Sequence, residues 1–84
     1  MKEKIMSDTI LEALRRRYEA EIAAAVANIN VYRTNPVGIG EHPDLVSAVD
    51  DQVSKLSNAV DKLTVLNQTI FDLEKGTIKP SGDN

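Results

Sequence analysis

The sequence predicts an all-α fold, in which two long helices form an antiparallel hairpin that oligomerises into a helical bundle or ring. Apolar residues recur at spacings of three and four along two segments, 8–33 and 43–75. A short stretch rich in Pro and Gly separates these segments. Aromatic residues make up only 4% of the 84 residues, so Ala, Val, Leu and Ile must supply the core, as they do in helical bundles.

The first helix is expected over residues 8–33, with Ser7 or Asp8 as its N-cap. No Pro or Gly interrupts this segment, and residues 20–27 are rich in Ala, the best helix former. The alanines leave a smooth surface that another helix can approach closely. The face expected to pack on the second helix carries Leu11, Leu14, Tyr18, Ile22, Ala25, Ile29 and Tyr32.

The connection is expected over residues 34–42. Pro36 removes a backbone N–H and disfavours helical backbone at the residue before it, which ends the first helix. Gly38 and Gly40 permit positive φ at the corner. His42 is expected at the N-cap of the second helix, because the proline that follows suits the first helical position.

The second helix is expected over residues 43–75, ending at Gly76, with a flexible tail over residues 76–84. Its apolar stripe follows two heptad positions of a coiled coil. One position is held by Val46, Val53, Val60 and Asn67, and the other by Val49, Leu56, Leu63 and Ile70. Asn67 is therefore expected on the core stripe, where a polar side chain fixes the register of helix packing.

The chain is short enough to form one domain, 1–84. Several apolar residues lie outside both stripes, and a layer of two helices leaves them in water. These residues are Ile10, Val26, Val31, Val65, Leu66 and Leu73. Their number predicts a homo-oligomer in which hairpins cover one another.

Composition argues against several classes of function. The net charge of -3 disfavours a protein that binds duplex nucleic acid, because such proteins need a basic face. No apolar run reaches the roughly 18 residues of a membrane span, and the first residues lack the apolar segment of a signal peptide. With one His and no Cys, no nucleophile, base and orienting group can be assembled, so we expect no enzyme, no cofactor and no metal site.

Two Arg–Tyr pairs are the first candidate ligand-binding residues: Arg17 with Tyr18, and Arg33 with Tyr32. A guanidinium matches phosphate oxygens, and a tyrosine ring can stack on a base. The pairs lie roughly 22 Å apart on one helix, so they can serve one ligand only across a subunit interface. The alternative is a solvated helix face on which the arginines pair with nearby glutamates.

The connecting loop supplies the other candidate ligand-binding residues: Asn35, Gly38, Gly40 and His42. Glycines before a helix N-terminus can offer backbone N–H groups to a phosphate. The alternative is a structured turn in which Val37 and Ile39 cap the end of the bundle.

The two helices and the connecting sequence NPVGIGEHPDL, residues 35–45, resemble small uncharacterised proteins of tailed phages. The resemblance assigns no site residues, but it implies a viral protein that acts in the bacterial host cytoplasm or is carried in the virion. In that context the predicted function is an anti-defence sponge, which sequesters a cyclic oligonucleotide or another phosphorylated signal of host immunity. The alternative is a phage structural or assembly protein, or one that binds a host protein. Only a sponge should lose function on Arg33→Ala.

Overall fold

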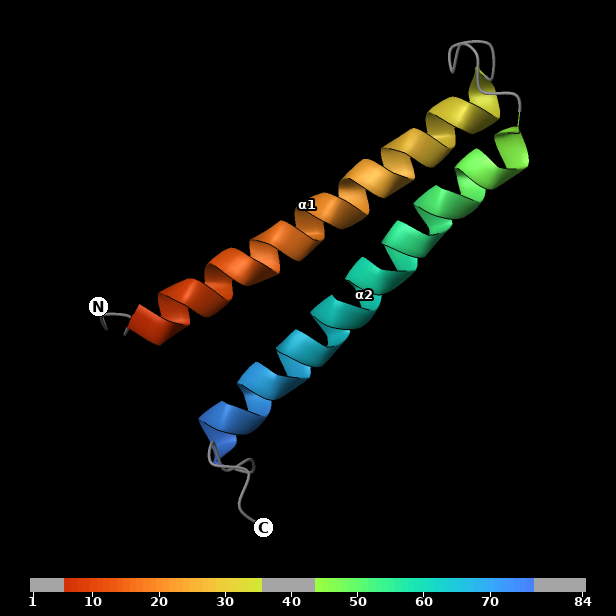
Figure 1. The fold of residues 1–84 in the computed structure, drawn as a ribbon. Coiled ribbons are helices and arrows are strands. Elements are labelled where there is room, and N and C mark those ends of the chain that lie inside the picture. Colours follow the sequence, from red (N-terminus) through yellow and green to blue (C-terminus); the bar gives the residue numbers. More distant parts are fainter. Residues whose placement is uncertain (1–5, 36–43, 77–84) are drawn as a thin grey trace.

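The computed structural model describes residues 6–35 and 44–76. Two helices account for nearly all of them: α1, Met6–Thr34, and α2, Leu45–Lys75. The helices lie side by side and run in opposite directions, so the start of α1 and the end of α2 lie at the same end of the molecule (Figure 1). The predicted all-α helical hairpin is therefore confirmed in the described part of the chain.

Two contacts show how the helices are aligned. Asn28 Nδ2 donates a hydrogen bond of 3.1 Å to Gln52 Oε1. The Lys62 ammonium lies 5.8 Å from the centre of the Tyr18 ring. Between these contacts, ten residues forward along α2 correspond to ten residues back along α1, as in an antiparallel pair with no slip in register.

The N-terminal cap of α2 is Asp44, so the prediction that His42 occupies this position is wrong. One carboxylate oxygen of Asp44 accepts from the Ser47 backbone N–H at 3.0 Å, and the other accepts from the Ser47 hydroxyl at 2.8 Å. A carboxylate satisfies the free N–H groups of a first turn well, which explains why the helix begins after the aspartate. His42 itself lies outside the described residues.

The C-terminal end of α2 is as predicted. Gly76 adopts φ 77°, and its backbone N–H donates to the carbonyl oxygens of Asp72 and Leu73. A left-handed residue at this point favours glycine, because a Cβ would be strained there.

The ends of α1 differ slightly from the prediction. The helix begins at Met6, so Ser7 and Asp8 lie inside its first turn and neither is the N-cap. It ends at Thr34, and the Asn35 N–H still donates to the Val31 carbonyl at 2.8 Å.

The face predicted for α1 is the face that packs on α2. Ala25 is buried with 2% of its surface exposed, and the other six residues predicted for this face are half-buried. We call the packed contact between the two helices the seam. The alanine at its centre lets the backbones approach closely.

On α2 one half of the predicted stripe is right and the other half is wrong. Val49, Leu56, Leu63 and Ile70 are half-buried, as expected. The second heptad position in the seam belongs instead to three buried residues: Gln52, Ala59 and Leu66. The residues predicted for it are exposed: Val46, Val53, Val60 and Asn67. Both sets lie three and four residues from the position held by Val49 and Leu56, so the spacing alone does not tell which set packs on α1.

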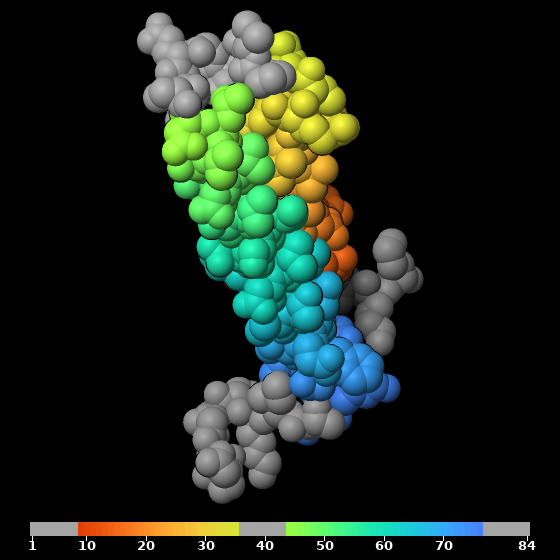
Figure 2. Space-filling view, turned by 90° about the vertical axis from the view of Figure 1, so that its right-hand side faces the viewer, coloured from red at the N-terminus to blue at the C-terminus, as the bar shows by residue number. Residues whose placement is uncertain are grey.

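The buried core is small. Among the described residues, the buried apolar side chains are Ala25, Ala48, Ala59 and Leu66, and three of these four are alanines. The molecule is 15 Å across in its thinnest direction, which corresponds to a single layer of helices. Figure 2 shows α2 along the length of one face, with α1 behind it. Side chains that point away from the seam, on either face of this layer, are therefore open to water.

Candidate functional site

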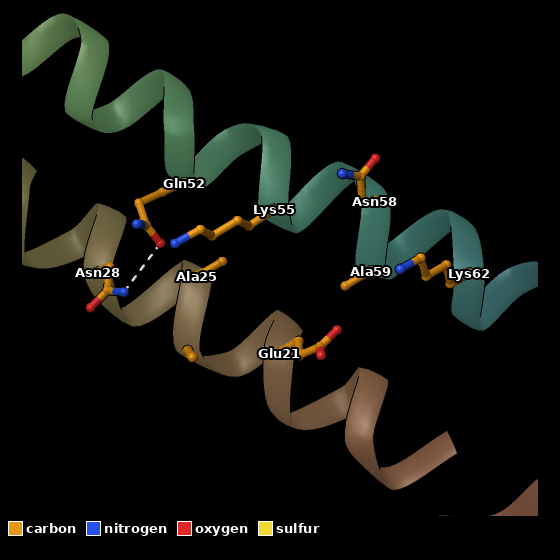
Figure 3. Close-up of a pocket in the computed structure, with 9 residues that line it drawn as sticks. Glu21, Ala25, Asn28, Gln52, Lys55, Asn58, Ala59 and Lys62 are labelled. Atoms are coloured by element: carbon orange, nitrogen blue, oxygen red, sulfur yellow. Dashed lines mark hydrogen bonds between the residues drawn. The ribbon is translucent and has the colours of Figure 1, made fainter. Parts of the chain in front are cut away.

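A groove of about 360 Å³ lies between the two helices near the middle of the hairpin. Figure 3 shows residues that line it on both helices. We call it the lysine groove. The full lining is Glu21, Ala24, Ala25 and Asn28 from α1, with Gln52, Lys55, Asn58, Ala59 and Lys62 from α2. The hollow exists because the buried alanines do not fill the space between the larger side chains on either side.

Two lysines give the groove its positive charge. Lys55 and Lys62 are seven residues apart on α2, so they share a face and are separated by roughly 10.5 Å along the helix axis. Among the described residues, neither lysine has an acidic partner within ion-pair distance. Glu21 is the acidic residue of the lining, and its carboxylate lies 3.7 Å from the guanidinium of Arg17.

Two amide side chains form the polar wall at one end of the groove. The bond between Asn28 and Gln52 crosses the seam, and Gln52 is buried with 7% of its surface exposed. Each amide uses one of its polar groups in this bond, which leaves the Asn28 carbonyl oxygen and the Gln52 amino group for other partners. Lys55 extends toward this pair (Figure 3).

A second hollow of about 340 Å³ adjoins the groove and shares Lys62 with it. Its lining is Tyr18, Asp61, Lys62, Val65, Leu66 and Thr69. The Lys62 ammonium lies over the Tyr18 ring, so one cation faces both hollows. A ligand with an anionic part and a flat apolar part would find complementary surfaces side by side.

The chemistry of this arrangement favours the binding of an anion. Two ammonium groups and an amide N–H attract and orient negative charge. The volume lies at the lower end of the range for small-molecule pockets, about 300–1,000 Å³. Two cations two helical turns apart suit a ligand that carries two separated anionic groups.

The first predicted Arg–Tyr pair lies beside this site. Arg17 forms an ion pair with Glu21 at the edge of the lysine groove, and Tyr18 lines the adjoining hollow. The predicted pair therefore lies at one end of the candidate site, although neither residue belongs to the lining of the lysine groove itself.

The second predicted pair lies elsewhere. Tyr32 is half-buried in the seam, and Arg33 Nη2 donates to Asn30 Oδ1 at 2.8 Å. Arg17 and Arg33 point about 160° apart around α1, given 3.6 residues per turn. A ligand on one hairpin cannot touch both, so the structure does not bring the two pairs together.

The loop residues contribute nothing to this site within the described chain. Asn35 is exposed, and its backbone N–H is taken by Val31. Gly38, Gly40 and His42 lie outside the described residues.

The remaining arginines of the cluster follow the alternative that the sequence allowed. Arg15 forms an ion pair with Glu12, and Arg16 approaches the same carboxylate at 3.1 Å. Both pairs join residues three or four apart on one helix, the geometry of a charged, solvated face.

Sequence reasoning missed the lysine groove. A usable signal was present, because Lys55 and Lys62 share the seven-residue spacing of Gln52, Ala59 and Leu66 and stand three residues after the first two of them. The lysines could be placed at the edge of the seam only once it was known that Gln52 and Ala59, and not the valines, pack on α1.

Two other kinds of site, metal centres and membrane spans, have no counterpart in the described residues. Within the described residues, no three His, Cys, Asp or Glu side chains gather as metal ligands would. Neither α1 nor α2 holds an apolar stretch of the length needed to cross a membrane. No protein-family model matches the chain, and no curated protein or solved structure is significantly similar to it. The resemblance to phage proteins stays a prediction.

Proposed function

We propose that this chain is a non-enzymatic helical binding module that sequesters a phosphorylated small molecule. The observation that carries the proposal is the lysine groove, in which Lys55 and Lys62 face a hollow without acidic partners among the described residues. The resemblance of residues 35–45 to phage proteins suggests the ligand, a cyclic oligonucleotide of host anti-phage immunity. A phage origin and action in the bacterial cytoplasm are parts of the same proposal.

A cyclic oligonucleotide suits the chemistry of the groove. It carries at least two phosphodiesters held apart by a ring, which matches two ammonium groups two turns apart. Its bases offer flat surfaces for the adjoining hollow beside Tyr18. Arg17, already at the edge of the groove, would exchange its ion pair with Glu21 for a phosphate, which a guanidinium binds with two parallel hydrogen bonds.

The proposal is tested by native mass spectrometry and calorimetry with a panel of cyclic di- and trinucleotides. The wild-type chain should bind one of them in fixed ratio. Lys55→Ala and Lys62→Ala should each weaken binding by about tenfold or more, since a hydrogen bond to a charged group contributes roughly 1.5–3 kcal/mol. Lys75→Ala is the matched control, because Lys75 is an exposed lysine of α2 that lies over Phe71, outside the groove.

Two results would contradict the proposal. One is a protein that binds no member of the panel. The other is binding that all three lysine variants weaken equally, since that would reflect total charge and not the groove.

The second candidate function is an interaction protein of a phage, either a structural or assembly component or a binder of a host protein. The observation that favours it is the row of exposed valines on α2, Val46, Val53 and Val60. Recovery of the chain in purified particles would support the structural role. A single host protein captured by the wild type, and lost with Val53→Asp, would support the inhibitor.

A further inference from the structure

The face of α2 beside the seam carries a second regular stripe. It runs along α2 at alternating spacings of four and three residues, and every member is exposed: Val46, Asp50, Val53, Ser57, Val60, Thr64 and Asn67. We call it the outer stripe. Its valines are large apolar residues left in water, with exposed fractions of 80% at Val46, 46% at Val53 and 44% at Val60.

We infer that a second copy of this chain packs on the outer stripe, with the two α2 helices antiparallel, to form a four-helix bundle. The inference rests on burial and helix geometry and does not depend on the proposed ligand. Its first support is the small core: three alanines and one leucine are the buried apolar residues in the described chain. A chain of this size with so little apolar burial needs another source of stability, and association supplies it.

The direction of the outer stripe fits a bundle. Val60 directly follows Ala59, and Val53 directly follows Gln52, so the outer stripe is turned by about 100° from the seam around α2. In a four-helix bundle each helix contacts two neighbours at roughly right angles. Helix α2 therefore presents one stripe to α1 and another in the direction where a neighbouring helix of a bundle would lie.

Helix α1 supports the same arrangement. Val26 is 49% exposed and lies at nearly the same level of the hairpin as Val53, given the alignment fixed by Asn28 and Gln52. When a two-fold axis perpendicular to the helices relates two antiparallel α2 helices, both α1 helices lie on the same side of the α2 pair. Val26 and its copy then face the interior of the bundle.

Charge selects the antiparallel orientation. With the two-fold axis at Ser57, Asp50 lies level with Thr64 of the second copy, whose hydroxyl can donate to the carboxylate. Val53 lies within one residue of the level of the second copy's Val60, close enough for the two side chains to pack. In a parallel pair Asp50 would meet its own copy, which places like charges together. Either orientation gives a two-fold interface, and the antiparallel one avoids the contact between the two Asp50 carboxylates.

This association leaves the lysine groove open. Lys55 follows Val53 by two residues, and Lys62 follows Val60 by two residues, so the lysines point about 200° away from the outer stripe. A dimer would carry two lysine grooves on its outside, one in each hairpin.

The test uses cysteine cross-linking, because the chain contains no Cys. Ser57→Cys places a thiol on the two-fold axis, and oxidised glutathione should convert the protein almost completely to a disulfide-linked dimer. Ser54→Cys is the matched control, an exposed serine one turn before Ser57. It should stay unlinked, because the two-fold axis separates it from its own copy by roughly 9 Å along the helix. Asn67→Cys should also stay unlinked, since only a parallel pair brings residue 67 next to its copy.

Sedimentation of the wild-type chain should give a dimer or a multiple of dimers. Val60→Asp should shift the profile to monomer, while Val65→Asp, at a valine of α2 that is 56% exposed and off the stripe, should not. A monomeric wild type, or equal linking of Ser57→Cys and Ser54→Cys, would overturn the inference. Linking through Asn67→Cys would overturn the antiparallel geometry.

Discussion

At the scale of single residues, the chain relies on polar side chains placed at critical points of an otherwise thin structure. Gln52 is a buried polar residue in the seam, and its bond to Asn28 joins the two helices. The sequence predicted a polar residue in the core, but it pointed to Asn67, which is exposed. Asn67 shares a heptad position with three valines, a pattern that predicts a polar residue in an apolar core. Gln52 shares its position with Ala59, whose small side chain gives only a weak apolar signal.

Replacing Gln52 tests what this polar pair contributes. Gln52→Leu should leave the free energy of unfolding unchanged or raise it by about 1 kcal/mol, because leucine gains apolar burial and the exposed Asn28 returns to water. The measurement is urea denaturation followed by circular dichroism. A loss of 2 kcal/mol or more would show that the hydrogen bond outweighs the apolar gain.

Asp44 provides a second test at this scale. Asp44→Ala removes the acceptor for the Ser47 N–H and should lower the free energy of unfolding by about 1 kcal/mol. Asp51→Ala, at an exposed aspartate inside α2, serves as the control and should change it by less than about 0.5 kcal/mol. Equal effects at both positions would argue against a capping role.

At the scale of helices, the sequence was sufficient for the elements and insufficient for the side on which α2 packs. Unbroken spacing of three and four predicted both helices, and Gly76 predicted the end of α2. The seam of α1 was correct because its apolar residues form a single stripe. On α2, the predicted stripe and the observed seam share Val49 and Leu56, and the valines outweigh Gln52 and Ala59 in any count of apolar residues. Close approach of the two helices favours alanine, but it is a property of the packed structure, so counting apolar residues in the sequence does not reveal it.

The same limit explains the candidate site. Arg17 and Tyr18 could be predicted as candidates because arginine beside tyrosine is a recognisable local combination. The lysine groove draws its residues from both helices, and lysines at exposed helix positions have no distinctive local signal. Only the alignment of Asn28 with Gln52 brings the groove residues together.

Close approach at the seam predicts the effect of enlarging its alanine. Ala59 is 2% exposed, so Ala59→Leu should force the helices apart and cost about 1–3 kcal/mol of stability. Ala27→Leu, at an exposed alanine of α1, should cost less than about 0.5 kcal/mol. Thermal unfolding followed by circular dichroism compares the two variants, and similar melting temperatures would argue against a tightly packed seam at Ala59.

At the scale of the whole molecule, stability and assembly should be linked. A layer 15 Å thick cannot cover its apolar residues alone, so a folded copy is stabilised by whatever binds its open face. If that partner is a second copy, the melting temperature must rise with protein concentration. A tenfold dilution should therefore lower it measurably for the wild type, whereas Val60→Asp should melt at one temperature over the same range. A wild-type melting temperature independent of concentration would contradict the linkage.

The outer stripe follows the seam by one residue along α2, and this offset also constrains how the length of α2 can change in evolution. Inserting or deleting one residue at its centre would turn one half of the helix by about 100° relative to the other, so that valines would enter the seam in one half only. A change of about seven residues would keep both stripes aligned. Helix α2 should therefore accept many substitutions, while its length varies only by whole heptads.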